Sequence, residues 1–171
     1  MQKSNYNYNE LIDCGNGKLF GAGNAKLPLP PMLMFDRISE INTDEGIYKK
    51  GCIKAELDIK NGMWFFNCHF KDDPVMPGCL GLDALWQLLG FYLAWKGNYG
   101  VGRALGCNKV GFKGQVLPSV KLLQYEIDIN RVREGKAVLG IADAKVIADG
   151  KQIYTAEGIK VGLFTSLDDF R

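Results

Sequence analysis

The sequence has one histidine in 171 residues, and its five cysteines include no Cys-x-x-Cys pair. Without such a pair the usual spacing of zinc ligands is missing. An odd number of cysteines also does not suit a disulfide framework. Reduced thiols are typical of the cytoplasm, so we expect the protein to act there.

The sequence also has a low net charge and few long apolar runs. The formal net charge is +2, which is too small to predict binding to nucleic acid. The polar segment 1–9 has no apolar core typical of an export signal. The best candidate for a membrane span, residues 79–95, is short and contains Asp83. We therefore expect neither nucleic acid nor membrane insertion.

The hydrophobic content of 47% and the length of 171 residues indicate one domain over residues 1–171 with a full core. Apolar and polar residues alternate in several segments, as in half-buried antiparallel strands. Asp149 and Gly150 form a two-residue hairpin signal. The sequence thus predicts an α+β fold, a curved antiparallel sheet around one buried helix, with strands expected at 32–41, 53–59, 103–112, 123–130, 137–148 and 152–163.

Residues 1–31 are expected to form a short helix and an irregular arm. Asn7 can cap the helix, Glu10 completes a capping box, and Gly15 follows the end. Three prolines at the end of the arm prevent regular strand pairing there, namely Pro28, Pro30 and Pro31.

Residues 79–95 carry apolar side chains at helical spacing and on both faces, which predicts a buried helix. Pro77 suits the first helical position, and Gly97 suits the C-terminal cap. Asp83 is the single charged residue of the segment. A carboxyl group among apolar side chains can stay protonated and act as an acid.

The histidine, His69, lies fourteen positions before Asp83. Imidazole both accepts and returns protons near neutral pH. The backbone N–H groups of Gly78 and Cys79 at the helix start can hold a carbonyl oxygen that gains negative charge. These residues would together supply a base, an acid and an oxyanion site. Such a combination predicts removal of the proton beside a thioester carbonyl, with loss of the β-hydroxyl group as water.

Other interpretations remain open on residue types alone. Cys79 at a helix start could act as a nucleophile activated by His69, as in a cysteine hydrolase or acyltransferase. Cys68, His69 and Cys79 offer soft metal ligands, but adjacent side chains on an extended segment point to opposite sides, so we expect no metal. His69 in the core, and Asp83 as a partner of the helix dipole, would fit a non-catalytic acyl-binding module.

Two runs carry a resemblance to a known family: Trp-Phe-Phe-Asn-Cys-His-Phe at 64–70 and Asp-Pro-Val-Met-Pro-Gly-Cys-Leu-Gly-Leu-Asp-Ala at 73–84. They resemble the 3-hydroxydecanoyl-acyl-carrier-protein dehydratase/isomerases of bacterial type II fatty acid synthesis. The likeness runs from Leu11 to Phe164 and includes residues 17–21, 32–34 and 160–164.

The resemblance implies a hot dog fold and a homodimer with shared active sites, in which His69 of one subunit works with Asp83 of the other. It implies dehydration of 3-hydroxyacyl thioesters to trans-2-enoyl forms, isomerisation of trans-2-decenoyl to cis-3-decenoyl, and no cofactor or metal. The sister dehydratase without isomerase activity usually has Glu at the helix position, so Asp83 favours the bifunctional branch. Asn67 departs from the glycine that close relatives often carry before Cys-His.

A fatty substrate also needs a tunnel and a docking surface. We expect the tunnel at Phe70, Val75 and Trp86. Other large apolar side chains could line it or simply pack in the core, namely Trp64, Phe65, Phe66, Leu82 and Phe91. The resemblance implies that an acidic acyl carrier protein docks on basic residues, namely Arg131, Arg133, Lys136 and Lys160.

Overall fold

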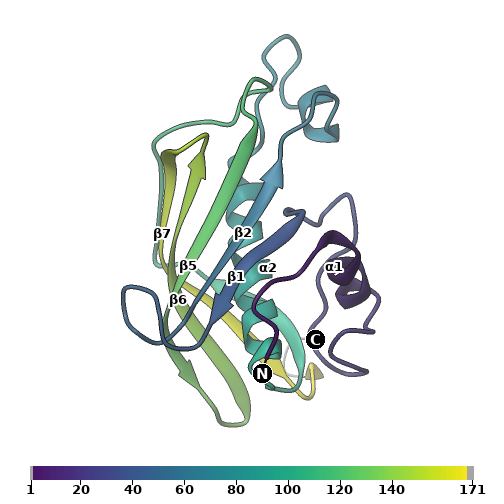
Figure 1. Ribbon diagram of the computed structural model, residues 1–171, viewed down its shortest axis with the longest axis vertical. Helices are drawn as coiled ribbons and strands as arrows, with labels where there is room; N and C mark the ends of the chain where they lie inside the picture. The colour runs from purple at the N-terminus through teal and green to yellow at the C-terminus, as the bar shows by residue number, and fades with distance from the viewer. Residues whose placement is uncertain (1, 169–171) are drawn as a thin grey trace.

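Seven antiparallel strands form one sheet that curves around a long central helix, α2 (Figure 1). The computed structural model describes residues 2–168. The strands follow the order β1-β2-β5-β6-β7-β3 across the sheet, and β4 pairs with β7 as well. The elements are α1 (Tyr8–Gly15), β1 (Arg37–Asn42), β2 (Cys52–Asp58), the 3-10 helix η1 (Trp64–Asn67), α2 (Gly78–Trp95), β3 (Val101–Gly106), β4 (Lys109–Phe112), β5 (Leu122–Arg133), β6 (Ala137–Ala148) and β7 (Lys151–Phe164). The predicted α+β architecture is confirmed.

Helix α2 fills the concave side of the sheet and contacts β2, β5, β6 and β7. Most of its residues are buried, among them Leu88 and Tyr92, because apolar side chains occupy every face of the helix. The sheet comes close to the helix at Gly140, where a Cβ atom would lie 3.1 Å from the Leu93 side chain. Glycine therefore allows β6 and α2 to pack at this distance.

The ends of α2 nearly match the prediction. Pro77 is the N-cap residue, one position before the first helical residue, Gly78. Lys96 is the C-cap, and Gly97 follows with a φ of 92°. This left-handed conformation is the one that glycine adopts readily after a helix end.

The N-terminal helix forms as predicted. The Asn7 side chain accepts a hydrogen bond from the Glu10 backbone N–H (3.2 Å), and the Glu10 carboxylate accepts one from the Asn7 N–H (2.9 Å). Leu11 and Cys14 bury the inner face of α1 in the core. The hairpin signal is also confirmed, because Asp149 and Gly150 connect β6 to β7 with positive φ angles of 45° and 83°.

Three local predictions were wrong. Residues 103–112 form two strands, β3 and β4, because the register shifts between Ala104 and Gly106 and the chain leaves the ladder before β4. Within 32–41 only the part from Arg37 onward is a strand. The Met34 N–H donates instead to the side chain of Gln87 in α2. The segment before Cys68 is the 3-10 helix η1 and not extended.

None of the helices in residues 2–168 combines the length and the apolar character that crossing a membrane requires. The five cysteines are free thiols: Cys14 and Cys52 are buried, Cys107 is half-buried, and Cys68 and Cys79 are exposed.

Burial between sheet and helix should dominate stability. Ile53 on β2 is 0% exposed, whereas Ile47 in the β1–β2 loop is 70% exposed. We expect Ile53→Ala to lower the free energy of unfolding by about 2–5 kcal/mol, because it leaves a cavity in the core. Ile47→Ala should change it by less than about 0.5 kcal/mol. Urea denaturation at one protein concentration checks this, and equal effects of the two variants would contradict the packing described.

Candidate active site

His69 follows η1, and the backbone of the next turn holds its ring in place. Its Nδ1 lies 2.8 Å from the carbonyl oxygen of Val75, and the Val75 N–H donates to the His69 carbonyl (2.8 Å). A carbonyl oxygen only accepts, so Nδ1 carries the proton of the neutral ring. Nε2 is then the nitrogen that can accept a proton, as a general base requires.

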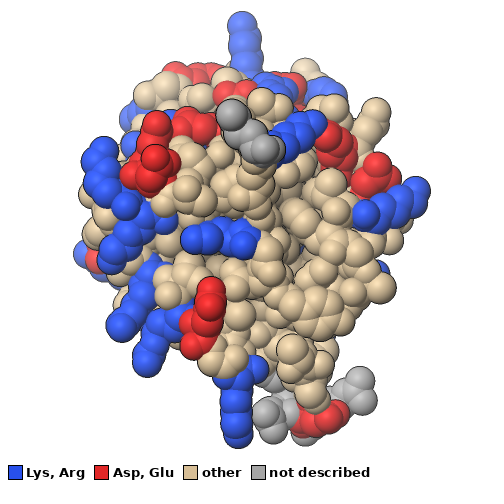
Figure 2. Space-filling view, turned by 60° about the horizontal axis from the view of Figure 1, so that its bottom comes forward, with Lys and Arg blue, Asp and Glu red and all other residues tan. Residues whose placement is uncertain are grey.

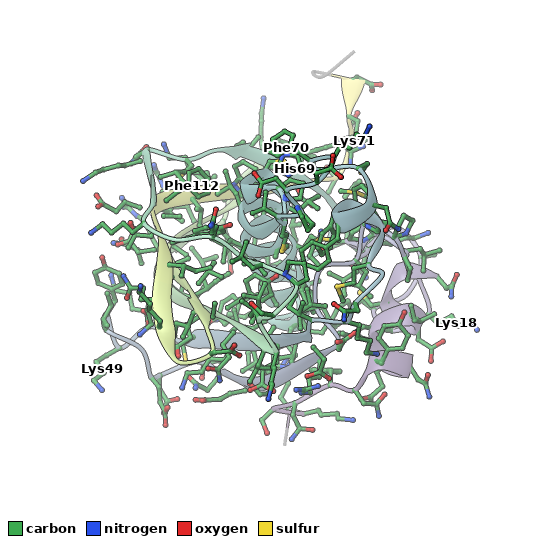
Figure 3. All side chains as sticks on the ribbon, turned by 90° about the horizontal axis from the view of Figure 1, so that it is seen from above. Lys18, Lys49, His69, Phe70, Lys71 and Phe112 are labelled. Atoms are coloured by element: carbon green, nitrogen blue, oxygen red, sulfur yellow. The ribbon has the colours of Figure 1, made fainter. Side chains whose placement is uncertain are left out.

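The ring of Phe70 lies against the His69 ring, with centroids 3.8 Å apart (Figure 3). Phe70 is 55% exposed and does not belong to the residues that line the cavity beside His69. The structure thus places Phe70 next to the imidazole on its outer side.

His69 opens into a cavity of about 500 Å³, which we call the His69 cavity. Gly78 and Cys79, the first residues of α2, line it together with Val75 and Leu82. Because the first N–H groups of a helix have no partner within the helix, the positive end of α2 faces this space. The structure therefore brings together the predicted base and the predicted oxyanion site. The lining residues are His69, Val75, Met76, Gly78, Cys79, Leu82, Phe112, Gly114, Gln115 and Tyr154.

Asp83 lies one turn further along α2 and lines a different cavity of about 250 Å³, the Asp83 cavity. Trp86 and Phe91 line this second cavity as well. Within one chain, then, the predicted acid and the predicted base do not share a cavity. The expected tunnel residues divide in the same way, with Val75 beside His69 and Trp86 beside Asp83.

Gln87 holds the Asp83 carboxylate, and residue patterns alone did not single it out. Its Nε2 donates to the Asp83 Oδ2 (2.6 Å) and to the Met32 carbonyl (2.8 Å), while its Oε1 accepts from the Met34 N–H (3.2 Å). Gln87 is buried, so these three bonds fix the orientation of its amide. The sequence does contain a signal for this contact. Gln87 follows Asp83 by four residues, and positions four apart share a helix face.

The remaining predicted tunnel residues lie elsewhere. Phe65 and Phe66 are buried in the core, and Trp64 is 42% exposed. Cys68 does not line the His69 cavity that contains Cys79, and its thiol faces the backbone oxygens of Trp64 and Phe65 at 3.6 Å. The three residues considered as metal ligands, Cys68, His69 and Cys79, therefore do not line one site.

The predicted docking residues gather at one end of the sheet. Arg131 and Arg133 on β5 and Lys136 in the β5–β6 turn are exposed, and Lys160 on β7 donates to the Asn108 side chain (2.7 Å). Figure 2 views this end of the molecule and shows Lys and Arg side chains gathered along one side.

Strand register explains the gathering. Arg131 pairs with Ile141, which pairs with Lys160. Two residues along, Arg133 pairs with Leu139 in the next row of the same face. The half-buried Ile141 thus lies between Arg131 and Lys160, and the half-buried Leu139 lies beside Arg133.

A comparison with protein families finds that residues 27–157 match the model of the FabA-like domain. The chain belongs to the FabA-like domain family. The matched residues include His69 and the whole of α2 with Asp83.

Solved structures that resemble the chain share its fold at low sequence identity. The dehydratase heterocomplex ApeI:P from Xenorhabdus doucetiae has a TM-score of 0.63 at 14% identity, covering 80% of this chain and 87% of that one. AziG from S. sahachiroi has a TM-score of 0.53 at 9% identity, with coverage of 74% and 89%. The virulence protein Cj0977 from Campylobacter jejuni has a TM-score of 0.53 at 13% identity, with coverage of 78% and 78%. The predicted hot dog fold is confirmed.

The contacts of Gln87 predict its contribution to stability. Gln87→Met keeps the volume but leaves the buried Met34 N–H without a partner and removes the donor to the Met32 carbonyl. We expect the free energy of unfolding to fall by about 1–3 kcal/mol, because an unpaired buried polar group costs about that much. Gln152→Met, on the exposed start of β7, is the matched control and should change it by less than about 0.5 kcal/mol. Chemical denaturation measures both, and similar effects would show that the Gln87 network contributes little.

Proposed function

We propose that this protein dehydrates 3-hydroxyacyl thioesters carried on acyl carrier protein and isomerises the medium-length product. One observation carries the proposal: the free Nε2 of His69 shares a cavity with the first N–H groups of α2. A base beside an oxyanion site is what removal of a proton next to a thioester carbonyl requires. Membership of the FabA-like family supports dehydratase chemistry on this scaffold.

The dehydration follows from these positions. The thioester carbonyl accepts hydrogen bonds from the N–H groups of Gly78 and Cys79, which stabilises negative charge on its oxygen. Nε2 of His69 removes a proton from the carbon beside the carbonyl. The protonated carboxyl group of Asp83 gives its proton to the β-hydroxyl group, which leaves as water. The products are a trans-2-enoyl thioester and one water molecule.

The isomerisation uses the same base. Nε2 of His69 removes a proton from C4 of the trans-2-decenoyl thioester, the double bond moves to carbons 3 and 4, and a proton is returned to C2. The product is the cis-3-decenoyl thioester, the precursor of unsaturated fatty acids. Asp83 in place of the glutamate of the sister dehydratase supports this bifunctional assignment over dehydration alone.

A homodimer would bring the two halves of the site together. In one chain His69 and Asp83 line separate cavities, so we propose that His69 acts with Asp83 of the partner subunit. β3 lies at the end of the strand order, and its residues Arg103–Leu105 are exposed. An edge strand of this kind can pair with a second copy and join the two sheets.

The basic end of the sheet suits an acidic partner. On one face, Arg131 and Lys160 flank the apolar Ile141, and Arg133 lies beside the apolar Leu139. Cations around an apolar centre steer an acidic protein toward a contact that then excludes water. We propose that the acyl carrier protein docks here. The free thiols and this partner support a cytoplasmic location.

An alternative function uses Cys79 as a nucleophile in a thioesterase or acyltransferase. The observation that favours it is that Cys79 is exposed and lines the cavity that contains His69. This chemistry transfers the acyl group from the carrier to the thiol and then to water or an acceptor. It produces a free acid or a new ester, not an enoyl thioester.

Complementation between subunits tests the shared site. His69→Ala and Asp83→Asn should each lower the rate of enoyl formation from 3-hydroxydecanoyl thioester by about 10²–10⁴-fold. When both variants are co-expressed, mixed dimers hold one complete site, because one subunit keeps His69 and the other keeps Asp83. Random mixing should restore about a quarter of the wild-type activity. No recovery in mixed dimers would contradict a site shared between subunits.

The matched control is Cys79→Ala, which keeps the backbone N–H and removes the thiol. It should retain enoyl formation if the dehydratase proposal holds. Loss of all turnover in Cys79→Ala, with free acid as the wild-type product, would establish the alternative instead. Analysis of the enoyl product for trans-2 and cis-3 isomers decides whether the isomerase step occurs.

Charge reversal tests the docking surface. Arg131→Glu combined with Arg133→Glu should raise KM for substrate on acyl carrier protein by about tenfold or more, because steering by opposite charge is lost. Turnover of the same acyl chain on a short thiol should not change, since that substrate does not meet the surface. Lys121→Glu, at the other end of β5, is the control. An equal loss with both substrates would show a structural defect and not a docking role.

A further inference from the structure

The first turn of α2 carries two backbone donors without an acceptor. Within residues 2–168, neither the Gly78 N–H nor the Cys79 N–H has a hydrogen-bond partner, whereas the Leu80 N–H donates to the Pro77 carbonyl (3.0 Å). Both free donors belong to residues that line the His69 cavity. A donor of this kind stabilises negative charge more strongly where water is excluded. The side chains that cover the first turn therefore affect the rate of the proposed reaction.

Two aromatic rings cover this turn from the side of the strands. A Cβ atom at Gly78 would lie 3.0 Å from Phe112 Cε1, and one at Gly81 would lie 2.6 Å from Tyr154 Cε2. Gly78 and Gly81 are three residues apart, so they share a face of the helix. Glycine at both positions lets the rings rest directly on the helix backbone. We call the rings of Phe112 and Tyr154 the aromatic wall.

Strand pairing holds the aromatic wall in place. Phe112 is the last residue of β4 and pairs with Tyr154 on β7, and their rings pack edge to face with centroids 4.7 Å apart. Directly after this pair, the Lys113 N–H donates to the Ile153 carbonyl (2.7 Å). Tyr154 is buried, whereas Phe112 is 54% exposed and forms the outer end of the wall. Figure 3 labels Phe112 together with His69, which lines the same cavity.

The surface beside the two donors is weakly polar. Among the described residues, the lining of the His69 cavity contains no aspartate, glutamate, lysine or arginine. Burial raises the pKa of the Tyr154 hydroxyl group, because the charged form would lose its hydration. A hydrogen bond to a charged oxygen is strong in such surroundings.

We propose that Phe112 strengthens the oxyanion site by keeping water from the Gly78 N–H at the start of α2. The proposal rests on the dehydratase function proposed above and adds a positioning residue to it. Phe112 acts through the donor that its ring covers and not on the reacting atoms. The negative charge that develops on the thioester oxygen then meets a donor that no water molecule occupies.

The kinetics of Phe112→Ala test the proposal. Its kcat for enoyl formation from 3-hydroxydecanoyl thioester should fall by about tenfold or more. Removing an oxyanion donor outright costs about 10²–10³-fold, and water weakens the donor without removing it. KM should change by less than about threefold, since the interaction becomes strong only in the transition state. Phe112→Leu keeps an apolar cover and should recover most of the lost kcat.

Tyr99→Ala is the matched control, because Tyr99 is also aromatic, is 55% exposed and does not line the His69 cavity. It should keep the wild-type kcat. Circular dichroism checks that each variant folds. Phe112→Thr replaces Phe112→Ala if the latter does not fold, because a β-branched residue suits a strand and its small polar side chain also admits water. It should show the same loss of kcat.

A spectroscopic measurement separates this role from a merely structural one. The probe is a decanoyl thioester of a short thiol, isotopically labelled at the carbonyl carbon, which has no β-hydroxyl group to lose. Its carbonyl stretch should move to lower wavenumber on binding to the wild type, because the donors polarise the carbonyl group. The shift should shrink in Phe112→Ala and stay complete in Tyr99→Ala.

The outcomes separate the two proposals. A wild type that forms no enoyl product would overturn the dehydratase function. An active wild type whose folded Phe112→Ala variant keeps its kcat, or keeps the full carbonyl shift, would overturn the role of Phe112 alone. A rise in KM with unchanged kcat would also overturn this role, because the ring would then only bind the substrate.

Discussion

The burial of α2 against the curved sheet is the constraint on which the rest of the structure depends. The helix supplies much of the core, with Leu88 and Tyr92 fully buried against strands that wrap around it. Gly78, the first residue of this helix, lines the His69 cavity, and Asp83 further along lines the Asp83 cavity. Because one rigid element carries both features, their spacing along the axis is set by helix geometry.

Polar groups on such a helix are costly unless each has a partner. Gln87 is the partner of Asp83, because its amide forms hydrogen bonds with the carboxylate and with the backbone of Met32 and Met34. This contact also ties the arm to the helix at Met32 and Met34, and β1 begins only at Arg37. The amide of Gln87 thereby fixes the orientation of the Asp83 carboxyl group, which is the acid of the proposed reaction.

His69 is oriented by a different means, through a backbone carbonyl in its own loop. That bond assigns the proton to Nδ1 and the basic lone pair to Nε2. The loop ends at Pro77, directly before α2 begins at Gly78, so only a few residues separate the imidazole from the helix N-terminus. The distance in sequence from His69 to Cys79 is short, and this explains why one cavity contains both.

Local patterns in the sequence determined a large part of this protein. The capping box at Asn7, the Asp149–Gly150 hairpin, the all-apolar helix and the alternating strands follow from side-chain period and turn chemistry, which act over a few residues. His69, Gly78 and Cys79 could be grouped because they lie close along the chain. Only the tertiary structure decided the rest. The break between β3 and β4, the link from Gln87 to the arm, and the Tyr154 ring under Phe112 join residues far apart in sequence. Such contacts depend on how the sheet curves onto the helix, and no local pattern encodes that packing.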